Sequence, residues 1–131
     1  MKDLTNLKTY IIDSENPHEV DDAISLEIGE NNIKKLWIHI SNPCSLFLQD
    51  SKIDLDARKQ NSSLYLTDKY VPMLPKEILG KANLSENKIS ETISAAIDFN
   101  NDGSINNYEI IEAIIKPKYQ LTYEDANEIL D

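Results

Sequence analysis

The sequence predicts an α+β fold (α/β mixed) in which hairpins build a largely antiparallel sheet and a few short helices accompany it. Two pairs of apolar runs carry this prediction, residues 23–28 with 33–40 and residues 92–99 with 105–115. Each pair is joined by a short turn rich in Asn, Asp and Gly, which is typical of β-hairpins. The helical patterns are shorter, and two of them follow a capping residue.

The chain has the size and composition of one soluble domain, and we expect no second domain in residues 1–131. With 131 residues and 40% hydrophobic content, it is long enough to bury a core. Its apolar runs fall far short of the roughly 18 residues of a membrane-spanning helix, and residues 1–4 lack the apolar core of a signal peptide. These features predict a cytoplasmic protein with no membrane partner. The single cysteine, Cys44, excludes an internal disulfide, and we expect it to be buried.

Acidic residues outnumber basic ones by 23 to 13, which gives a formal net charge of −10. A chain of this charge repels polyanions at long range, so the balance counts against a free-standing RNA- or DNA-binding protein. The argument weakens if metal ions neutralise some of the acids, or if another part of a larger protein supplies a basic surface.

The first strand pattern, residues 10–12, leads into a loop in which carboxylates crowd together. Five acids fall within ten residues, at positions 13, 15, 19, 21 and 22. Each close pair of like charges costs roughly 1 to 4 kcal/mol, so a folded cluster needs cations, protons or exposure to water. Oxygen ligands suit magnesium or manganese, and the flanking strands place the acids where a rigid sheet meets a loop. The alternative is a loop that is simply solvated.

The second strand pattern, residues 23–28, continues through turn residues 29–32 into a third, residues 33–40, to make the first hairpin. His39 lies in the later strand. Its functional interpretation is a ligand or an acid–base group, whereas its structural interpretation is a histidine hydrogen-bonded in place. We favour the structural one, which is commoner for a histidine in a strand.

Between the two hairpins the sequence predicts short elements. Ser51 is placed to cap a helix over residues 53–61. Two prolines forbid a regular helix or a central strand over residues 71–75, so this segment is expected to run extended. One helical turn follows over residues 75–79.

The last third of the chain predicts a hairpin and then a helix. The turn is residues 100–104, in which Asp-Gly is a strong hairpin signal between the second pair of apolar runs. Thr122 precedes Asp125 by three residues, which is a capping-box pattern. We therefore expect a final helix that extends through Leu130.

Taken in order, these patterns resemble one family, the RNB catalytic domain of the ribonuclease II and ribonuclease R exoribonucleases. The acid loop resembles the family's signature, and the run Pro72-Met73-Leu74-Pro75 follows it at the expected distance. The resemblance spans residues 10–130. It is also carried by His39-Ile40-Ser41, by Ser51, Asp54 and Ala57, by Tyr65-Leu66-Thr67-Asp68, by Asp102-Gly103 and by Leu121-Thr122-Tyr123.

The resemblance implies an RNB-like domain that hydrolyses single-stranded RNA from the 3′ end to nucleoside 5′-monophosphates, with magnesium or manganese. Carried over by position, Asp13, Asp21 and Asp22 are its catalytic carboxylates and hold the metal together with Glu19. Tyr65 matches the aromatic residue that stacks on an RNA base near the scissile end. Ions held by carboxylates activate water and absorb charge on the phosphate, and an aromatic ring is a sequence-neutral platform for a base.

The chain also departs from the family's pattern. Glu19 stands where most relatives have aspartate, Asn42 replaces a frequent aspartate, and Ser90 replaces a common arginine. Only the N-terminal portion of a single RNB-type domain is matched, without the later segments that carry a catalytic arginine and much of the RNA channel. We therefore expect the rest of the nuclease to lie C-terminal to this partial domain, and the chain to be inactive alone.

Two alternatives compete with the nuclease interpretation. Residues 98–109 match the EF-hand calcium-binding loop, including Gly103 and the final glutamate. An EF-hand needs a helix on each side, and the preceding residues are β-branched, so we favour a hairpin here. The second alternative is a non-catalytic interaction remnant of the nuclease, in which the acid loop persists as scaffold and Tyr65 is core packing.

Overall fold

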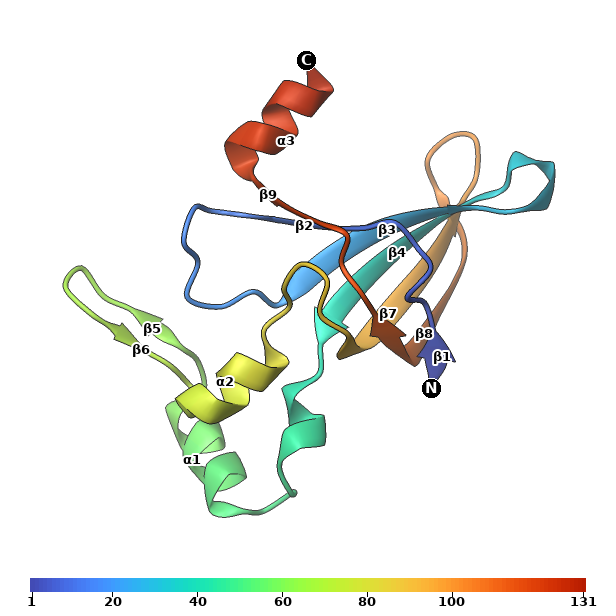
Figure 1. Ribbon diagram of the computed structural model, residues 1–131. Coiled ribbons are helices and arrows are strands. Elements are labelled where there is room, and N and C mark those ends of the chain that lie inside the picture. The colour runs from blue at the N-terminus through green and yellow to red at the C-terminus, as the bar shows by residue number, and fades with distance from the viewer. The chain divides into compact units, whose positions relative to one another are not determined.

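Seven strands form one sheet in the computed structural model, which describes residues 1–131 (Figure 1). The chain divides into two compact units. The first joins Met1–Ser41 with Leu84–Asp131, and the second is Asn42–Asn83. The strands of the sheet all belong to the first unit and are β1 (Lys2–Asp3), β2 (Thr9–Asp13), β3 (Asp22–Ile28), β4 (Lys34–Ser41), β7 (Ser90–Phe99), β8 (Ile105–Ile115) and β9 (Tyr119–Thr122).

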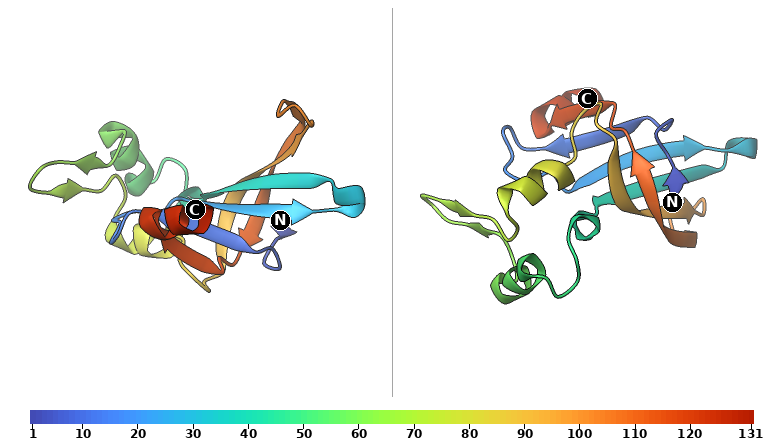
Figure 2. Two further views of the ribbon diagram at one scale, coloured as in Figure 1. Left: turned by 90° about the horizontal axis from the view of Figure 1, so that it is seen from above. Right: turned by 60° about the horizontal axis from the view of Figure 1, so that its bottom comes forward.

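The strand order across the sheet is β1-β8-β7-β4-β3-β2-β9. The four central pairs are antiparallel, whereas β1 joins β8 and β9 joins β2 in parallel at the two margins. Figures 1 and 2 show the two long hairpins, β3–β4 and β7–β8, side by side. The predicted α+β fold with a largely antiparallel sheet is therefore confirmed.

Alternation along the strands gives the sheet two different faces. On β3, Ala23 and Ser25 are buried while Ile24 between them is exposed. Directly paired residues share a face of the sheet, and Ser25 pairs with the buried Trp37, which pairs with the buried Ala96. We call this buried side the closed face.

The closed face packs into the main core of the first unit. Trp37, Ile11 and Ile115 are fully buried there, and each large apolar side chain stabilises the fold by roughly 1.5 to 3 kcal/mol. Leu4, Val20 and Leu84, from segments outside the strands, also belong to the cluster. The indole N–H of Trp37 is satisfied at the edge of the core by Glu27.

The loop that resembles an EF-hand is the turn of a β-hairpin. The Asn100 N–H donates to the Ser104 carbonyl at 2.8 Å, and the Asp102 carboxylate accepts the Ser104 N–H at 2.9 Å. Gly103 has a φ of 87°, a conformation that favours glycine. Strands β7 and β8 flank this turn, so the paired helices of an EF-hand are absent and the expected hairpin is confirmed.

The other predicted turn and cap also form. A single 3-10 turn, η1 (Glu30–Asn32), connects β3 to β4. The last helix, α3 (Tyr123–Leu130), begins with a capping box. In it the Thr122 hydroxyl accepts the Asp125 N–H at 3.1 Å, and the Asp125 carboxylate accepts the Thr122 N–H at 3.0 Å. No helix of the structure reaches the length and apolar character that crossing a bilayer requires.

The second unit is built from short elements around a small core of Ala57, Leu74 and Ile78. Ser51 caps the first α-helix as predicted, because its hydroxyl accepts the Asp54 N–H at 3.4 Å. The elements of this unit are η2 (Pro43–Leu46), α1 (Lys52–Gln60), β5 (Leu64–Tyr65), β6 (Tyr70–Val71) and α2 (Lys76–Ala82).

Two expectations for the second unit are corrected. The helix expected over residues 75–79 runs on to Ala82. Cys44, expected to be buried, is exposed. The single turn η2 buries none of its residues, and Phe47 just beyond it packs against the small core instead.

Candidate functional site

The acid loop, residues 13–22, lies at one end of the sheet, where β2 ends and β3 begins. The two strands are antiparallel, so the last residue of β2, Asp13, and the first of β3, Asp22, lie at the same end. Backbone hydrogen bonds fix the later half of the loop. The Ser41 N–H donates to the Asp21 carbonyl at 2.7 Å, and the Leu84 N–H donates to the Val20 carbonyl at 2.9 Å.

Burial of Val20 anchors this part of the loop in the core. Its neighbours on either side, Glu19 and Asp21, are therefore held at the surface. Glu19 and Asp13 are half-buried, whereas Asp21 and Asp22 are exposed. The Asp13 carboxylate also accepts the Ser14 N–H at 2.7 Å, which orients it at the end of β2.

Four carboxylates of the loop interact electrostatically. Loss of water around its carboxylate raises the pKa of Asp21, and the charges of Glu19, Asp22 and Asp13 raise it further. Each contributor is one of the residues that the sequence analysis named as metal ligands. The structure thus brings all four into one electrostatic neighbourhood, while Glu15 is exposed and is not among the causes.

The donor set fits a hard divalent cation, because it consists of carboxylate oxygens whose mutual repulsion a cation would relieve. No three His, Cys, Asp or Glu side chains lie close enough together in the structure to form a metal-binding group. The assignment of Asp13, Glu19, Asp21 and Asp22 as metal ligands therefore stays a prediction.

Tyr65 lies in β5 of the second unit and is 62% exposed, so it is not core packing. Its cross-strand partner on β6 is Tyr70, and their ring centroids are 5.0 Å apart at an interplanar angle of 41°. The sequence analysis did not name Tyr70. The pairing of the two short strands, which have weak patterns, brings the two rings together.

His39 is held in a buried hydrogen-bond chain, which confirms its structural interpretation. Its Nε2 is 2.6 Å from the Ser25 hydroxyl, and its Nδ1 is 2.8 Å from the Ser94 hydroxyl. The chain continues from Ser25 to Thr9 and from Ser94 to Thr92, at 2.8 Å each. Burial lowers the pKa of His39 to about 4, so the ring is neutral at pH 7. A neutral imidazole donates with one nitrogen and accepts with the other, as this chain requires.

Three lysines line a concavity at the other end of β2, and the sequence analysis did not find it. Lys8, Lys116 and Lys118 surround it, and no acidic side chain is among its lining residues. Lys8 precedes β2 and Asp13 ends it, so at about 3.3 Å per residue the two ends lie ~17 Å apart. The lysines come from two segments more than a hundred residues apart, and only the strand pairing reveals them together.

Backbone hydrogen bonds hold the segments of this concavity, which we call the lysine pocket. The Lys118 N–H donates to the Thr9 carbonyl at 2.9 Å, and the Asn87 N–H donates to the Pro117 carbonyl at 2.7 Å. The Lys118 ammonium also lies 5.7 Å from the centroid of the Tyr119 ring. The pocket therefore presents cationic groups on a fixed backbone, which suits an anion.

Comparison with known proteins agrees with this architecture. An uncharacterised ribonuclease of Synechocystis sp. is 37% identical over 129 residues, which are 98% of this chain and 19% of that protein. The chloroplastic/mitochondrial ribonuclease II of Arabidopsis thaliana is 35% identical over 98% of this chain and 16% of its own length. This chain thus spans about a fifth of the curated relatives that it matches.

Solved structures share the fold over the whole chain. RNase R of Mycoplasma genitalium, in complex with double-stranded RNA, matches with a TM-score of 0.90 and 27% identity, over 98% of this chain and 23% of that one. A yeast pseudonuclease matches with a TM-score of 0.88 at 24% identity, over 99% of this chain and 16% of that one, which shows the fold alone. The RNB domain family model matches residues 1–131, through both units. The chain therefore belongs to the RNB domain family.

Proposed function

We propose that this chain is the carboxylate-bearing part of a 3′-to-5′ exoribonuclease domain that degrades single-stranded RNA with magnesium. One observation supports the proposal most. Within a chain that is similar to ribonucleases along its whole length, Glu19, Asp22 and Asp13 all act on the carboxylate of Asp21. Such a concentration of negative charge at the end of a sheet is costly, and a bound cation would relieve it.

Each carboxylate has a distinct part in this proposal. Asp13, Asp21 and Asp22 supply the catalytic ligands, and Glu19 supplies a fourth with a longer side chain. Bound magnesium or manganese supplies an activated water and absorbs charge on the phosphate. Backbone hydrogen bonds to the carbonyls of Val20 and Asp21 fix this part of the loop, and so fix the direction in which the Asp21 side chain leaves it.

RNA contacts complete the proposal. The exposed ring of Tyr65 offers a stacking surface for a base, and such stacking is independent of base identity. The lysine pocket contacts backbone phosphates at a distance from the acids. Two of the similar solved structures are RNase R complexes, one with double-stranded RNA and one with ribose-methylated single-stranded RNA, which supports RNA as the ligand.

The test uses a longer protein, in which the chain continues to the end of an RNB domain. We expect Asp22→Asn to lower the release of mononucleotides on the order of a hundredfold, because it deletes ligand charge without deleting volume. RNA binding, measured by fluorescence anisotropy, should change little.

Glu15→Gln is the matched control, since it changes an exposed carboxylate of the same loop that we do not assign to the metal. This variant should keep most of its activity. Full turnover by Asp22→Asn would refute the site assignment. A longer protein that binds RNA but releases no mononucleotides with either metal would favour the non-catalytic alternative.

A further inference from the structure

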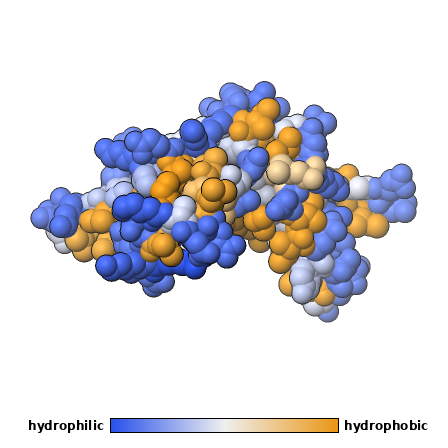
Figure 3. Space-filling model, turned by 90° about the horizontal axis from the view of Figure 1, so that it is seen from below, coloured by the Kyte–Doolittle hydropathy of each residue, from blue (hydrophilic) through white to orange (hydrophobic).

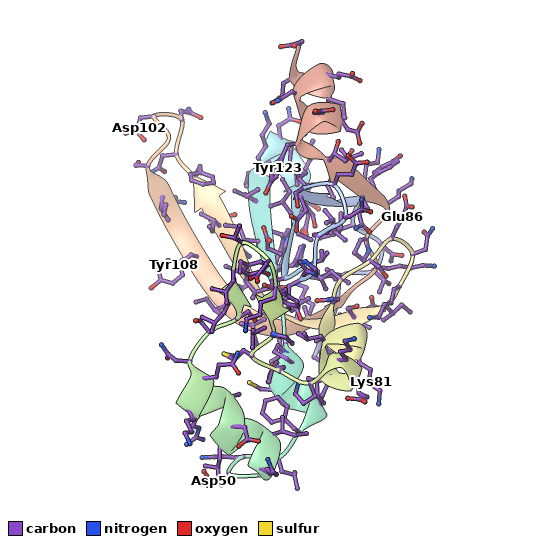
Figure 4. All side chains as sticks on the ribbon, turned by 90° about the vertical axis from the view of Figure 1, so that its left-hand side faces the viewer. Asp50, Lys81, Glu86, Asp102, Tyr108 and Tyr123 are labelled. Atoms are coloured by element: carbon purple, nitrogen blue, oxygen red, sulfur yellow. The ribbon has the colours of Figure 1, made fainter.

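The side of the sheet opposite the closed face carries large apolar side chains that nothing in the first unit covers. We call it the open face and define it by Ile24, Leu26, Ile28, Ile93, Tyr108 and Ile110. Exposed fractions on it reach 61% for Ile28, 66% for Tyr108 and 65% for Ile110. Figure 4 shows the ring of Tyr108 projecting away from β8. These values are high for isoleucine and tyrosine, which are usually buried in part.

Strand pairing joins these side chains into one surface. Ile24 pairs with Ile38, Ile38 with Ala95, and Ala95 with Ile110. This row crosses four strands that lie about 4.8 Å apart, so it is ~14 Å wide. The next row on the same face consists of Leu26, Leu36, Ile97 and Tyr108.

The open face is more apolar than a solvated sheet face usually is. The closed face buries Ser25, His39 and Ser94, whereas the open face presents aliphatic and aromatic side chains. An antiparallel sheet with one solvated face normally turns its polar side to water. Figure 3 shows hydrophobic surface between the hydrophilic tips of the two hairpins. A contiguous apolar patch of this kind marks an interaction surface.

A cleft of about 880 Å³ continues the open face between the tips of the two hairpins. Leu26, Leu36 and Phe99 contribute apolar surface. The polar lining is mostly amide, from asparagines of both tips. Side-chain amides both donate and accept hydrogen bonds, so they match the N–H and C=O groups of a polypeptide.

We propose that the open face and its cleft are the docking surface for polypeptide from the remaining part of the RNB domain. The region shared with this chain makes up 19% of one curated relative and 16% of another, so these relatives are five to six times as long as that region. They therefore contain further polypeptide that could cover the open face. The occupant is protein and not RNA, because Lys34 is the one cationic residue lining the cleft and the rows above are uncharged. This inference rests on family membership and does not depend on catalysis.

The experiment compares thiol reactivity at Ile110→Cys in the 131-residue chain and in the longer protein, both carrying Cys44→Ser to remove the exposed native thiol. We expect rapid labelling in the short chain and labelling at least about tenfold slower in the longer protein, where reaction requires local opening. Lys52→Cys is the control, because the Lys52 side chain is 88% exposed. Its labelling should be equally fast in both proteins.

A second variant keeps the test independent of labelling chemistry. Ile110→Lys should leave the melting temperature of the short chain unchanged, since the site is exposed, and should lower that of the longer protein, where the charge is buried. Equal labelling of Ile110→Cys in both proteins would overturn the proposal. A second result would also overturn it. If the short chain forms concentration-dependent dimers that Ile110→Lys abolishes, and the same change does not lower the melting temperature of the longer protein, the occupant is a second copy of the chain.

Discussion

His39 links three strands of the sheet through two hydroxyls, and it does so as a neutral ring. Ser25 on β3 and Ser94 on β7 lie on either side of it, with no acidic partner in the chain of hydrogen bonds. A protonated ring would have to donate from both nitrogens and would be buried as an unpaired charge. The low pKa of His39 therefore follows from its position in the closed face.

This position predicts a pH-dependent stability. The unfolded chain protonates His39 near the ordinary pKa of about 6.5, whereas the folded protein does so only near 4. Between these values the unfolded state binds more protons, so the free energy of unfolding rises with pH. The contribution is complete above pH 6.5 and is lost as the pH falls towards 4, by up to about 3 kcal/mol. Urea unfolding of His39→Gln across this range should show a flatter profile.

His18→Gln is the control for that measurement, because His18 is the other histidine and is exposed. Its profile is the reference for removing a histidine outside the buried hydrogen-bond chain. An identical slope for His39→Gln would mean that other groups govern the acid lability.

The pKa of Asp21 is shifted in the opposite direction to that of His39. The folded state raises its pKa, so at neutral pH its charged form is less favourable in the fold than in the unfolded chain. We expect Asp21→Asn to raise the free energy of unfolding at pH 7 by less than about 1 kcal/mol, since water and salt screen an exposed group. The gain should disappear at acid pH, where Asp21 is protonated. Magnesium should stabilise the unchanged protein more than the variant.

Asp102→Asn should change the free energy of unfolding in the opposite direction to Asp21→Asn. Hydrogen bonds from Ser104 lower the pKa of Asp102, so its charge is favoured by the fold and the variant should lose stability at pH 7. Thermal melts of the two variants, with and without magnesium, separate the effects. Destabilisation by Asp21→Asn would contradict the proposal that neighbouring carboxylates repel Asp21. Equal stabilisation of the unchanged protein and of Asp21→Asn by magnesium would contradict the assignment of Asp21 as a metal ligand.

Among the elements, those with local signals were predictable from the sequence. Asp102-Gly103 marked the second hairpin, and Ser51 and Thr122 marked the starts of helices, because turns and caps depend on nearby residues. The marginal strands β1 and β9 were missed. They are two and four residues long and pair in parallel with distant strands, so only tertiary contacts define them.

The lysine pocket supports a prediction at the same scale. In the longer protein, Lys116→Gln combined with Lys118→Gln should weaken RNA binding and make it less dependent on salt, because fewer counterions are released. Both residues are exposed, so the fold should be unaffected. Anisotropy titrations at several salt concentrations measure the affinity and its slope.

A charge-matched control decides whether the effect is local. Lys59→Gln with Lys76→Gln removes the same charge from exposed positions elsewhere in the chain. If this pair weakens binding equally, general charge and not the lysine pocket attracts the RNA.

For the whole molecule, the order of motifs was more informative than composition. The net charge of −10 counted against RNA binding, while the acid loop and the Pro72–Pro75 run indicated a ribonuclease family that the comparisons show. The resemblance named four carboxylates as candidate metal ligands, an assignment that stays a prediction, but it could not give their mutual distances, which depend on where Val20 is anchored. The lysine pocket and the open face could not be predicted, since strand register creates both.

This chain by itself lacks part of what phosphodiester hydrolysis requires. Hydrolysis of a phosphodiester needs cationic stabilisation of the phosphate as well as metal ligands, and an arginine that acts in the transition state is worth several orders of magnitude in rate. The only arginine here, Arg58, pairs with Asp54 in α1. With a charge of −10, we expect the chain also to attract RNA poorly.

We therefore expect the 131-residue chain to release mononucleotides from single-stranded RNA far more slowly than the longer protein does under the same magnesium concentration. The measurement is chromatography of the products over time, with Asp22→Asn in both proteins as the blank. Comparable release by the two proteins, lost in both on Asp22→Asn, would show that this fifth of the relatives' length holds the complete catalytic apparatus. The requirement for a cationic half supplied from elsewhere would then be wrong.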